Sequence, residues 1–276
     1  MRFISGIPCS GTTLLVNLLG CHSQLGPIYE TEFVLDWITV LETNQPTAQA
    51  LWSVMDKWSS GLPQRPDSKK DYEKYPFGPH YILFDRKYAL EQTRELLKRL
   101  EDGEDKYKAM GGTITSLLDK HAEISNNTYW INKTPLYIMA LSYIHKMFPK
   151  MKVINCVRDG RDLAHTVLAR PFGPNKVEDA APWYISMINA AHKFRDKFPA
   201  QYLEIKYEDM IENTEETVSK CLEFWGMEDE SKIIVGAYPY DIYSNRIGIY
   251  KTKPEVTGFS DGEGKRCLEE AGYGRE

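Results

Sequence analysis

Residues 6–13, with the sequence GIPCSGTT, have the residue types and the spacing of a phosphate-binding loop. They follow a short apolar run and precede a stretch with helical apolar spacing. In the pattern G-x-x-x-x-G-K-[ST], backbone N–H groups and the positive end of a helix dipole hold phosphates, and the lysine reaches the β- and γ-phosphates. Thr12 stands at the lysine position here. The loop therefore predicts a cradle for a single phosphate or a phosphosulfate rather than for Mg-ATP, and the alternative is a βα turn without function.

A second candidate anion site is the segment 157–170, VRDGRDLAHTVLAR, which follows another apolar run. Arg158 ends that run, and Asp162, Thr166 and Arg170 are spaced four residues apart, so that on a helix they would share one face. Arginine is suited to forked, charge-assisted hydrogen bonds to phosphate. The spacing predicts that the two arginines and the hydroxyl converge on one anion. The alternative is a surface helix whose aspartate forms ion pairs with neighbouring arginines.

Short apolar runs alternate with longer stretches of helical spacing, and these elements must position both segments. The sequence predicts buried strands at residues 3–7, 26–29, 129–131, 151–157 and 202–205. It predicts helices at residues 12–19, 32–41, 90–100, 107–118, 137–147, 162–168, 183–198 and 217–225. Such alternation indicates βαβ units, with ligands at the carboxyl ends of the strands. We therefore predict an α/β fold, a three-layer sandwich with a central parallel sheet.

The length of 276 residues fits one domain with an insertion. Residues 45–125 show helical spacing and no evident strand, and the stretch 59–80 is rich in proline. We predict a single domain over residues 1–276 with a helical cap inserted at about 45–125. The aromatic residues of the cap either line an acceptor pocket or form its own core, and the second interpretation is favoured. They include Trp52, Trp58, Tyr72, Tyr75, Phe77, Tyr81 and Phe84.

Composition excludes several classes of protein. The chain has 34 Lys+Arg and 39 Asp+Glu, a net charge of −5, which argues against a basic nucleic-acid binder. A hydrophobic content of 42% argues against disorder. The five cysteines are scattered and form no Cys-x-x-Cys pair, so neither a disulfide framework nor a zinc site is expected. With no long apolar run and a strand predicted at the N-terminus, we expect a soluble, cytoplasmic protein without a membrane span.

Together these segments resemble those of sulfotransferases that use 3′-phosphoadenylyl sulfate (PAPS). Residues 6–15 are similar to the 5′-phosphosulfate loop of that family, and residues 157–170 are similar to its 3′-phosphate motif. Further similarity lies at residues 132–135, 202–209, 222–226 and 246–248. The resemblance implies a P-loop-like fold. It also implies in-line transfer of a sulfuryl group from PAPS to a hydroxyl or amine of an acceptor, which leaves adenosine 3′,5′-bisphosphate (PAP) and needs no metal.

The resemblance implies a set of residues that bind the nucleotide donor. Backbone N–H groups and hydroxyls of residues 10–13 would hold the departing 5′-phosphate. Arg158 and Thr166 would bind the 3′-phosphate, and Arg246 with Gly248 would close over it. Tyr207 would contact the nucleotide or support the loop. The full set is Cys9, Ser10, Gly11, Thr12, Thr13, Arg158, Thr166, Arg170, Tyr207, Arg246 and Gly248.

Glu30 and Lys133 are the expected catalytic residues. Glu30 follows a predicted strand, and the stretch from the loop to this residue is similar in spacing to tyrosylprotein sulfotransferases, in which a glutamate at this position is the general base. Lys133 resembles the catalytic lysine of the family and would stabilise the transferring group. The alternatives are that Glu30 only helps to start a helix and that Lys133 is an ordinary solvated lysine. His80 and His165 are weaker candidates for the base.

Cys9 departs from the family pattern, which usually has lysine or arginine at this loop position. A neutral thiol cannot neutralise the charge of the leaving phosphate. We expect Lys133 or another cation to compensate. One alternative is a protein that binds PAPS or PAP with weak or no turnover, and a second is a P-loop kinase, against which Thr12 argues.

Overall fold

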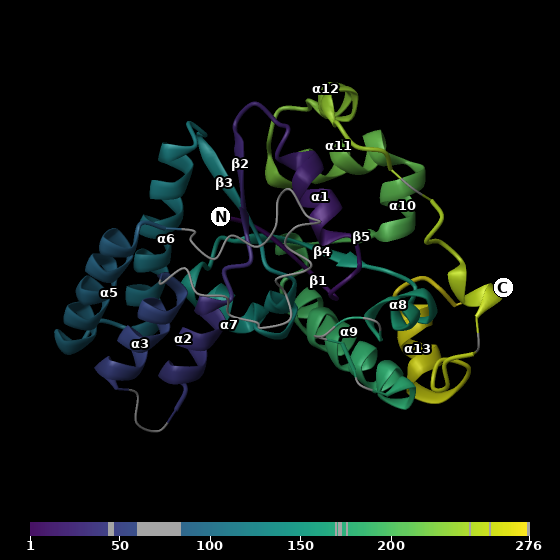
Figure 1. Ribbon diagram of the computed structural model, residues 1–276, viewed down its shortest axis with the longest axis horizontal. Helices are drawn as coiled ribbons and strands as arrows, with labels where there is room; N and C mark the ends of the chain where they lie inside the picture. The colour runs from purple at the N-terminus through teal and green to yellow at the C-terminus, as the bar shows by residue number, and fades with distance from the viewer. Residues whose placement is uncertain are drawn as a thin grey trace. The chain divides into compact units, whose positions relative to one another are not determined.

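Five parallel strands form one sheet in the computed structural model of the chain (Figure 1). Their order is β2-β3-β1-β4-β5, and their bounds are Arg2–Gly6 (β1), Leu25–Tyr29 (β2), Tyr129–Lys133 (β3), Lys152–Val157 (β4) and Tyr202–Lys206 (β5). The structure describes residues 1–43, 47–59, 84–168, 170, 173–174, 176–242, 244–253 and 255–274. Each predicted strand is confirmed to within two residues at either end, and so is the α/β fold with a central parallel sheet.

The chain divides into two compact units. Unit 1 comprises Met1, Ser23–Thr134 and Ser142–Met151, and it contains β2 and β3. Unit 2 comprises Arg2–His22, Pro135–Leu141 and Lys152–Glu276, and it contains β1, β4 and β5. Each unit therefore carries its own set of strand ends and its own candidate site residues.

Helices dominate unit 1. They are α2 (Phe33–Leu41), α3 (Ala48–Ser59), α5 (Arg86–Glu101), α6 (Lys106–Ile124) and, apart from its first residue, α7 (Leu141–Met147). Aspartates cap two of them: Asp85 accepts the N–H of Tyr88 at 2.9 Å, and Asp105 accepts those of Tyr107 and Lys108 at 3.1 and 2.9 Å. Helix α3 packs against α2 and α5, and α5 packs against α6 (Figure 1). No strand occurs among the described residues 47–59 and 84–125.

The described aromatic residues of the predicted cap pack within unit 1. The ring of Phe33 meets those of Trp37, Trp58 and Phe84 edge-on, with centroid distances of 5.3, 6.4 and 5.9 Å. The guanidinium of Arg94 lies 5.1 Å from the ring centroid of Trp52. Trp58 and Phe84 thus pack against α2, which lies outside the predicted cap, so the interpretation that the cap aromatics form a core of their own stays a prediction. Four of them, Tyr72, Tyr75, Phe77 and Tyr81, lie outside the described residues.

Unit 2 is built on three strands, of which β1 and β4 are mostly apolar runs buried over nearly their whole length, whereas β5 is only partly buried. Strand β4 pairs with β1 from Arg2↔Lys152 to Gly6↔Cys156 and with β5 from Val153↔Tyr202 to Val157↔Lys206. Burial on both faces explains such runs in a parallel sheet. The helices of this unit are α1 (Thr12–Leu19), α8 (Gly160–Val167), α9 (Ala180–Lys197), α10 (Tyr207–Glu212), α11 (Thr214–Trp225), α12 (Ser231–Ala237) and α13 (Gly262–Glu270).

One helix prediction needs correction, and four helices had no prediction of their own. The helix predicted at residues 137–147 is a 3-10 segment, Pro135–Met139, followed by the separate helix α7. The apolar spacing continues across Ala140, where the two segments meet, so the pattern conceals the break. Helices α3, α10, α12 and α13 were not predicted. Further 3-10 segments lie at Val177–Asp179, Pro199–Gln201 and Ile249–Thr252.

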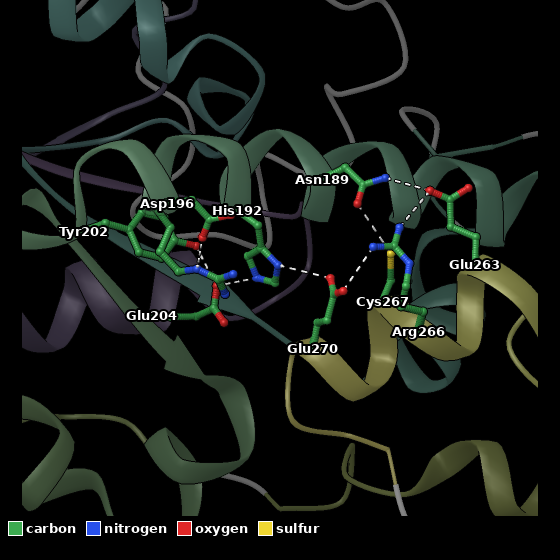
Figure 2. A network of polar contacts seen from close by, with 10 residues as sticks. Asn189, His192, Asp196, Tyr202, Glu204, Glu263, Arg266, Cys267 and Glu270 are labelled. Carbon is green, nitrogen blue, oxygen red and sulfur yellow. Dashed lines mark hydrogen bonds and ion pairs between the residues drawn. The ribbon is translucent and has the colours of Figure 1, made fainter.

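A polar network joins α9, β5 and α13 within unit 2 (Figure 2). The Nε2 of His192 lies 3.2 Å from Oε2 of Glu204. The same carboxylate oxygen accepts a hydrogen bond from the hydroxyl of Tyr202. On its other side, Nδ1 of His192 lies 3.8 Å from Glu270 of α13. Burial opposes ionisation of Glu204, but the hydrogen bonds from His192 and Tyr202 outweigh it and lower the pKa of this carboxyl.

Two further observations concern membrane-spanning helices and disulfides. Within the described ranges, no helix combines the length and the apolar character that a bilayer crossing requires. None of the five cysteines, all of which the structure describes, forms a disulfide.

Candidate functional site

The loop between β1 and α1 in unit 2 has the backbone of an anion cradle. Gly6 and Gly11 have φ angles of 156° and 91°. A Cβ atom on Gly6 would lie 2.6 Å from the carbonyl oxygen of Cys156, and one on Gly11 would lie 2.7 Å from the ring of Tyr207. Glycine is therefore required at both positions, because the loop passes too close to its neighbours for any side chain. Tyr207 supports the loop from the start of α10.

Helix α1 begins with unoccupied hydrogen-bond donors. Its N-cap residue is Gly11, which offers no side chain, and the first backbone hydrogen bond runs from Leu15 N–H to the carbonyl of Gly11 at 3.0 Å. The preceding N–H groups, those of Thr12, Thr13 and Leu14, therefore have no acceptor within the helix. Free N–H groups and the positive end of a helix dipole bind phosphate and sulfate. The first turn of α1 therefore presents the donors that the predicted anion site requires.

Ser10 contributes to the shape of the cradle. Its N–H donates to the carbonyl of Ile7 at 3.0 Å, and its hydroxyl donates to the carbonyl of Cys156 at 2.8 Å. The side chain is fully buried. Both donors of Ser10 are thus engaged within the protein, whereas those of the following helical turn are open. Binding of the 5′-phosphate by Ser10 stays a prediction.

Arg158, at the carboxyl end of β4, is a buried cation without a counter-charge. Only 1% of the residue is exposed, and no carboxylate forms an ion pair with it in the part of the chain that the structure describes. Its Nη1 lies 3.4 Å from both the Thr166 hydroxyl and the Cys9 carbonyl, and its Nη2 donates to the carbonyl of Arg246. Its Nε is buried and has no hydrogen-bond partner. An unpaired buried charge is costly, so this geometry fits a guanidinium that a bound anion completes.

Three arginines surround the side chain of Cys9. Burial raises the pKa of this thiol, while the positive charges of Arg170, Arg158 and Arg246 oppose the rise. Cys9 also has a φ of 74°, a left-handed conformation that is uncommon for a residue with a side chain. The structure therefore brings the predicted cations of the second motif to the loop and places them around a thiol that is neutral near pH 7.

The position of Arg170 differs from the prediction. Helix α8 ends at Val167, and the N–H of Arg170 donates to the carbonyl of Val167 at 2.9 Å in a turn beyond the helix. Arg170 therefore does not share a helical face with Asp162 and Thr166. The reason is local: Pro171 follows in the sequence, and the residue before a proline is disfavoured in the helical conformation.

Asp162 has a role that the sequence did not reveal. Its carboxylate accepts the N–H of Gly248 at 2.7 Å and that of Tyr250 at 2.9 Å. Gly248 has a φ of 72°, which explains the glycine there. Neither predicted role for Asp162, on the anion-binding face or in an ion pair with a neighbouring arginine, describes these contacts. No local pattern could have identified a partner 86 residues away.

The candidate catalytic residues meet in unit 1. The parallel register pairs Tyr29 with Lys133, so Glu30 and Lys133 lie side by side at the carboxyl ends of β2 and β3. The N–H of Glu30 donates to the carbonyl of Lys133 at 2.8 Å, and the ammonium group forms an ion pair with the carboxylate. Lys133 is only 3% exposed, and its Nζ lies 5.5 Å from the ring centroid of Tyr29. The alternative of a solvated lysine is therefore wrong.

A buried network of hydroxyl and amide groups holds the backbone beside Glu30. The Thr134 hydroxyl accepts the N–H of Thr31 at 3.0 Å, lies 3.1 Å from the Thr31 hydroxyl and donates to Asn132 Oδ1 at 3.1 Å. The amide of Asn132 donates to the Thr31 hydroxyl at 2.8 Å. Glu30 itself has a φ of 52°, which costs energy for a non-glycine residue. Strain of this kind occurs often at functional sites, and here the network stabilises it.

The other candidates contribute less. His165 lies on α8, with its Nε2 buried and without a partner, and His80 lies outside the described residues. Among the residues that the structure describes, no three His, Cys, Asp or Glu side chains are grouped as metal ligands would be.

Comparison with solved structures supports the fold. A sulfotransferase domain from the olefin synthase of Synechococcus PCC 7002 superposes with a TM-score of 0.65 and 16% identity, covering 100% of this chain and 95% of that one. A sulfotransferase domain from the curacin biosynthetic pathway gives 0.62 and 16%, covering 99% and 97%. At this level of identity the likeness shows a shared fold.

Comparison of sequences identifies relatives. The chain is 28% identical to a protein-tyrosine sulfotransferase of Drosophila melanogaster over 232 residues, which is 80% of this chain and 37% of that protein. It is 26% identical to protein-tyrosine sulfotransferase 1 of Homo sapiens over 168 residues, 61% and 34% respectively. The chain thus spans about a third of the length of these two relatives. The model of the Sulfotransferase family matches residues 3–231. With this match over most of its length, the chain belongs to the sulfotransferase family.

Proposed function

We propose that this protein is a PAPS-dependent sulfotransferase that transfers a sulfuryl group to a hydroxyl of its acceptor. The observation that carries the proposal is the buried guanidinium of Arg158, which has no described carboxylate partner and lies 3.4 Å from the Thr166 hydroxyl. The same unit holds the open first turn of α1. Two separate sets of anion-binding groups suit a donor with two anionic ends, which PAPS has and a nucleoside monophosphate lacks.

In this proposal the donor is held at both ends by unit 2. Backbone N–H groups of Thr12 and Thr13 would bind the 5′-phosphosulfate, and Arg158 with Thr166 would bind the 3′-phosphate. Arg246, whose carbonyl is held by Arg158, would add positive charge at the 3′-phosphate. The three arginines around Cys9 are cations that could compensate for the neutral thiol in the loop. These arginines are candidates for the other cation in the expectation that Lys133 or another cation compensates.

The reaction would be an in-line displacement. The acceptor oxygen forms a bond to sulfur while the bond between sulfur and the 5′-phosphate oxygen breaks, and PAP departs. Glu30 would take the proton of the acceptor hydroxyl as general base. Lys133 would stabilise negative charge on the sulfuryl oxygens. The ion pair between these two residues supports the roles, because it shows that the carboxylate and the ammonium group lie together at the carboxyl ends of β2 and β3.

The names of the relatives suggest where to look for the acceptor. Several of them are protein-tyrosine sulfotransferases, so a phenolic hydroxyl, presented as tyrosine in a peptide, is the first acceptor class to test. Small phenols, sugars and lipid alcohols form the rest of a screen with labelled PAPS. Label transferred to one class and not to the others would define the acceptor.

Thermal unfolding with nucleotides tests the donor assignment before the acceptor is known. PAP should raise the melting temperature more than adenosine 5′-phosphate (AMP) at equal concentration, because only PAP carries the 3′-phosphate. Equal shifts from both nucleotides would contradict the assignment of Arg158 and Thr166. Arg158→Lys keeps the charge but loses the forked geometry, and it should reduce the PAP shift while leaving the AMP shift nearly unchanged.

Two other functions give different results in the same experiments. A binding protein without turnover would be stabilised by PAP and would transfer no label to any acceptor. Cys9, in place of a basic loop residue, is the observation that favours this alternative. A kinase would transfer phosphate from Mg-ATP and would not respond to PAP.

A further inference from the structure

We propose that Asp162 is a positioning residue that sets the preference of this protein for a 3′-phosphorylated nucleotide, although it would not touch the nucleotide. It would do so by fixing the segment 246–250, the glycine loop, through two backbone N–H groups. The inference rests on the proposed donor site. Part of the selectivity of that site is thereby assigned to a residue that does not contact the nucleotide.

The contacts of Asp162 are specific. One carboxylate oxygen accepts the N–H of Gly248 at 2.7 Å, and the other accepts the N–H of Tyr250 at 2.9 Å. The side chain projects from the first turn of α8 and is 1% exposed. Hydrogen bonds to a charged acceptor are about twice as strong as those between neutral groups. A single carboxylate thus anchors the turn at the middle of the glycine loop.

Two neighbours of Asp162 hold the same loop at other points. Arg158 donates from Nη2 to the carbonyl of Arg246. The guanidinium of Arg161 lies 4.1 Å from the ring centroid of Tyr250 and is itself oriented by bonds of 2.9 and 2.6 Å to the Asp159 carboxylate. The segment 158–162 therefore contacts the glycine loop through three residues, of which only Asp162 does so through a charged acceptor.

The charge arrangement explains why an aspartate is suitable here. Arg158, four residues before Asp162, has no ion-pair partner among the described residues, and the carboxylate of Asp162 is satisfied by amide groups instead. The aspartate therefore fixes the loop that carries Arg246 and leaves the guanidinium of Arg158 available to an anion. An aspartate paired with Arg158 would have cancelled that charge.

The experiment compares Asp162→Asn with Asp105→Asn as a matched control. Asp105 also accepts two backbone N–H groups, at the start of α6 in unit 1, far from the glycine loop in sequence. Asparagine retains the size of the side chain but presents a donor to one of the two amides. Dissociation constants for PAP and AMP are measured by calorimetry for the wild type and both variants.

We expect Asp162→Asn to weaken PAP binding about tenfold and AMP binding little. Asp105→Asn should leave both constants unchanged, and Asp162→Glu, which keeps a charged acceptor, should recover part of the preference. If Asp162→Asn has the same ratio of PAP affinity to AMP affinity as the wild type, the inference is overturned. Equal affinities in the wild type itself would instead contradict the donor assignment, so the two failures are distinguishable.

Hydrogen exchange tests the inference without a variant, in case Asp162→Asn does not fold. The amides of Gly248 and Tyr250 should be protected in the free protein, and PAP should protect them further while AMP does not. Exchange of both amides at the rate of an unfolded chain in the presence of PAP would overturn the inference.

Discussion

Glu30 and Lys133 form an ion pair at the ends of neighbouring parallel strands, although 103 residues separate them in the chain. The register of β2 and β3 brings the two residues together, because it sets Tyr29 opposite Lys133. Lys133 is buried whereas the Glu30 side chain is 25% exposed, so removal of the carboxylate would leave a buried ammonium group uncompensated. The presence of the ion pair at strand ends, where α/β folds bind ligands, favours a role in chemistry.

Glu30→Gln should lower kcat by about 10² to 10⁴-fold, the usual contribution of a general base. PAP affinity should not change, because the carboxylate is assigned to the acceptor proton and not to the nucleotide. Steady-state kinetics with the best acceptor from the screen, together with PAP calorimetry, measure both effects.

Glu32→Gln is the matched control for this substitution, because Glu32 lies two residues away at the N-cap of α2. It should leave kcat unchanged. A larger loss in Glu32→Gln than in Glu30→Gln would move the base to Glu32 and restore the interpretation that Glu30 only begins the helix.

Thr134→Val should destabilise the protein by about 1–3 kcal/mol, because it leaves the buried N–H of Thr31 and the amide of Asn132 with poorer partners. It should also lower kcat, since the strained backbone of Glu30 would relax. Urea unfolding and kinetics measure the two effects, and Thr134→Ser, which keeps the hydroxyl, should restore both.

Thr113→Val controls for the loss of a buried threonine hydroxyl as such. Among the described residues, the Thr113 hydroxyl bonds to the carbonyl of Ala109 within α6, at 3.2 Å, and to no other group. The Thr113→Val variant should leave kcat unchanged. A loss of activity equal to that of Thr134→Val would argue that the effect of the Thr134 substitution is general destabilisation.

Cys9→Gly should stabilise the fold by about 1 kcal/mol, because glycine adopts the observed φ of 74° without strain. Cys9→Arg should give no gain in kcat, since Arg158, Arg170 and Arg246 already place positive charge around this position. A wild type that binds PAPS tightly but is inactive, together with an active Cys9→Arg variant, would show that the thiol impairs turnover.

The raised pKa of the Cys9 thiol makes a separate prediction about its reactivity. The nucleophile in alkylation is the thiolate, so iodoacetamide should label Cys9 more slowly at pH 7.5 than it labels a free thiol in solution. Mass spectrometry of timed samples measures the rate, and PAP should slow it further. Labelling as fast as that of a small thiol would contradict the buried, protonated state.

The Glu204 network should make stability depend on acid pH. The pKa of this carboxyl is lower in the folded protein than its ordinary value of 4.5, so ionised Glu204 contributes stability at pH values above 4.5. That contribution is lost as the pH falls through the folded-state pKa, because protonation then weakens the contacts to His192. Urea unfolding between pH 7 and pH 3 should show a smaller acid-induced loss in Glu204→Gln than in the wild type.

Glu215→Gln provides the control for this pH series, because Glu215 is an exposed carboxyl on α11. Its acid profile should follow that of the wild type. A Glu204→Gln profile that also follows the wild type would contradict the role of the network.

Local features of this protein could be predicted from the sequence because they depend on neighbouring residues. The glycines of the loop at residues 6–13 mark a backbone that approaches its surroundings closely, and the apolar runs mark strands that are buried on both faces. The helix α1 was predicted with its observed bounds, Thr12–Leu19, because the apolar spacing and the preceding glycine both mark its start. These elements, with the family resemblance, led to the donor site.

The partners of the site residues depended on tertiary structure. The bonds of Asp162 to Gly248 and Tyr250 and the ion pair of Glu30 with Lys133 join residues far apart in the chain. Such pairs depend on strand register and on how a loop packs against a helix, and neither is encoded in a local window. The same holds for the charge of Arg158: its residue type suggests a phosphate ligand, but only the fold shows that it is buried without a described carboxylate partner.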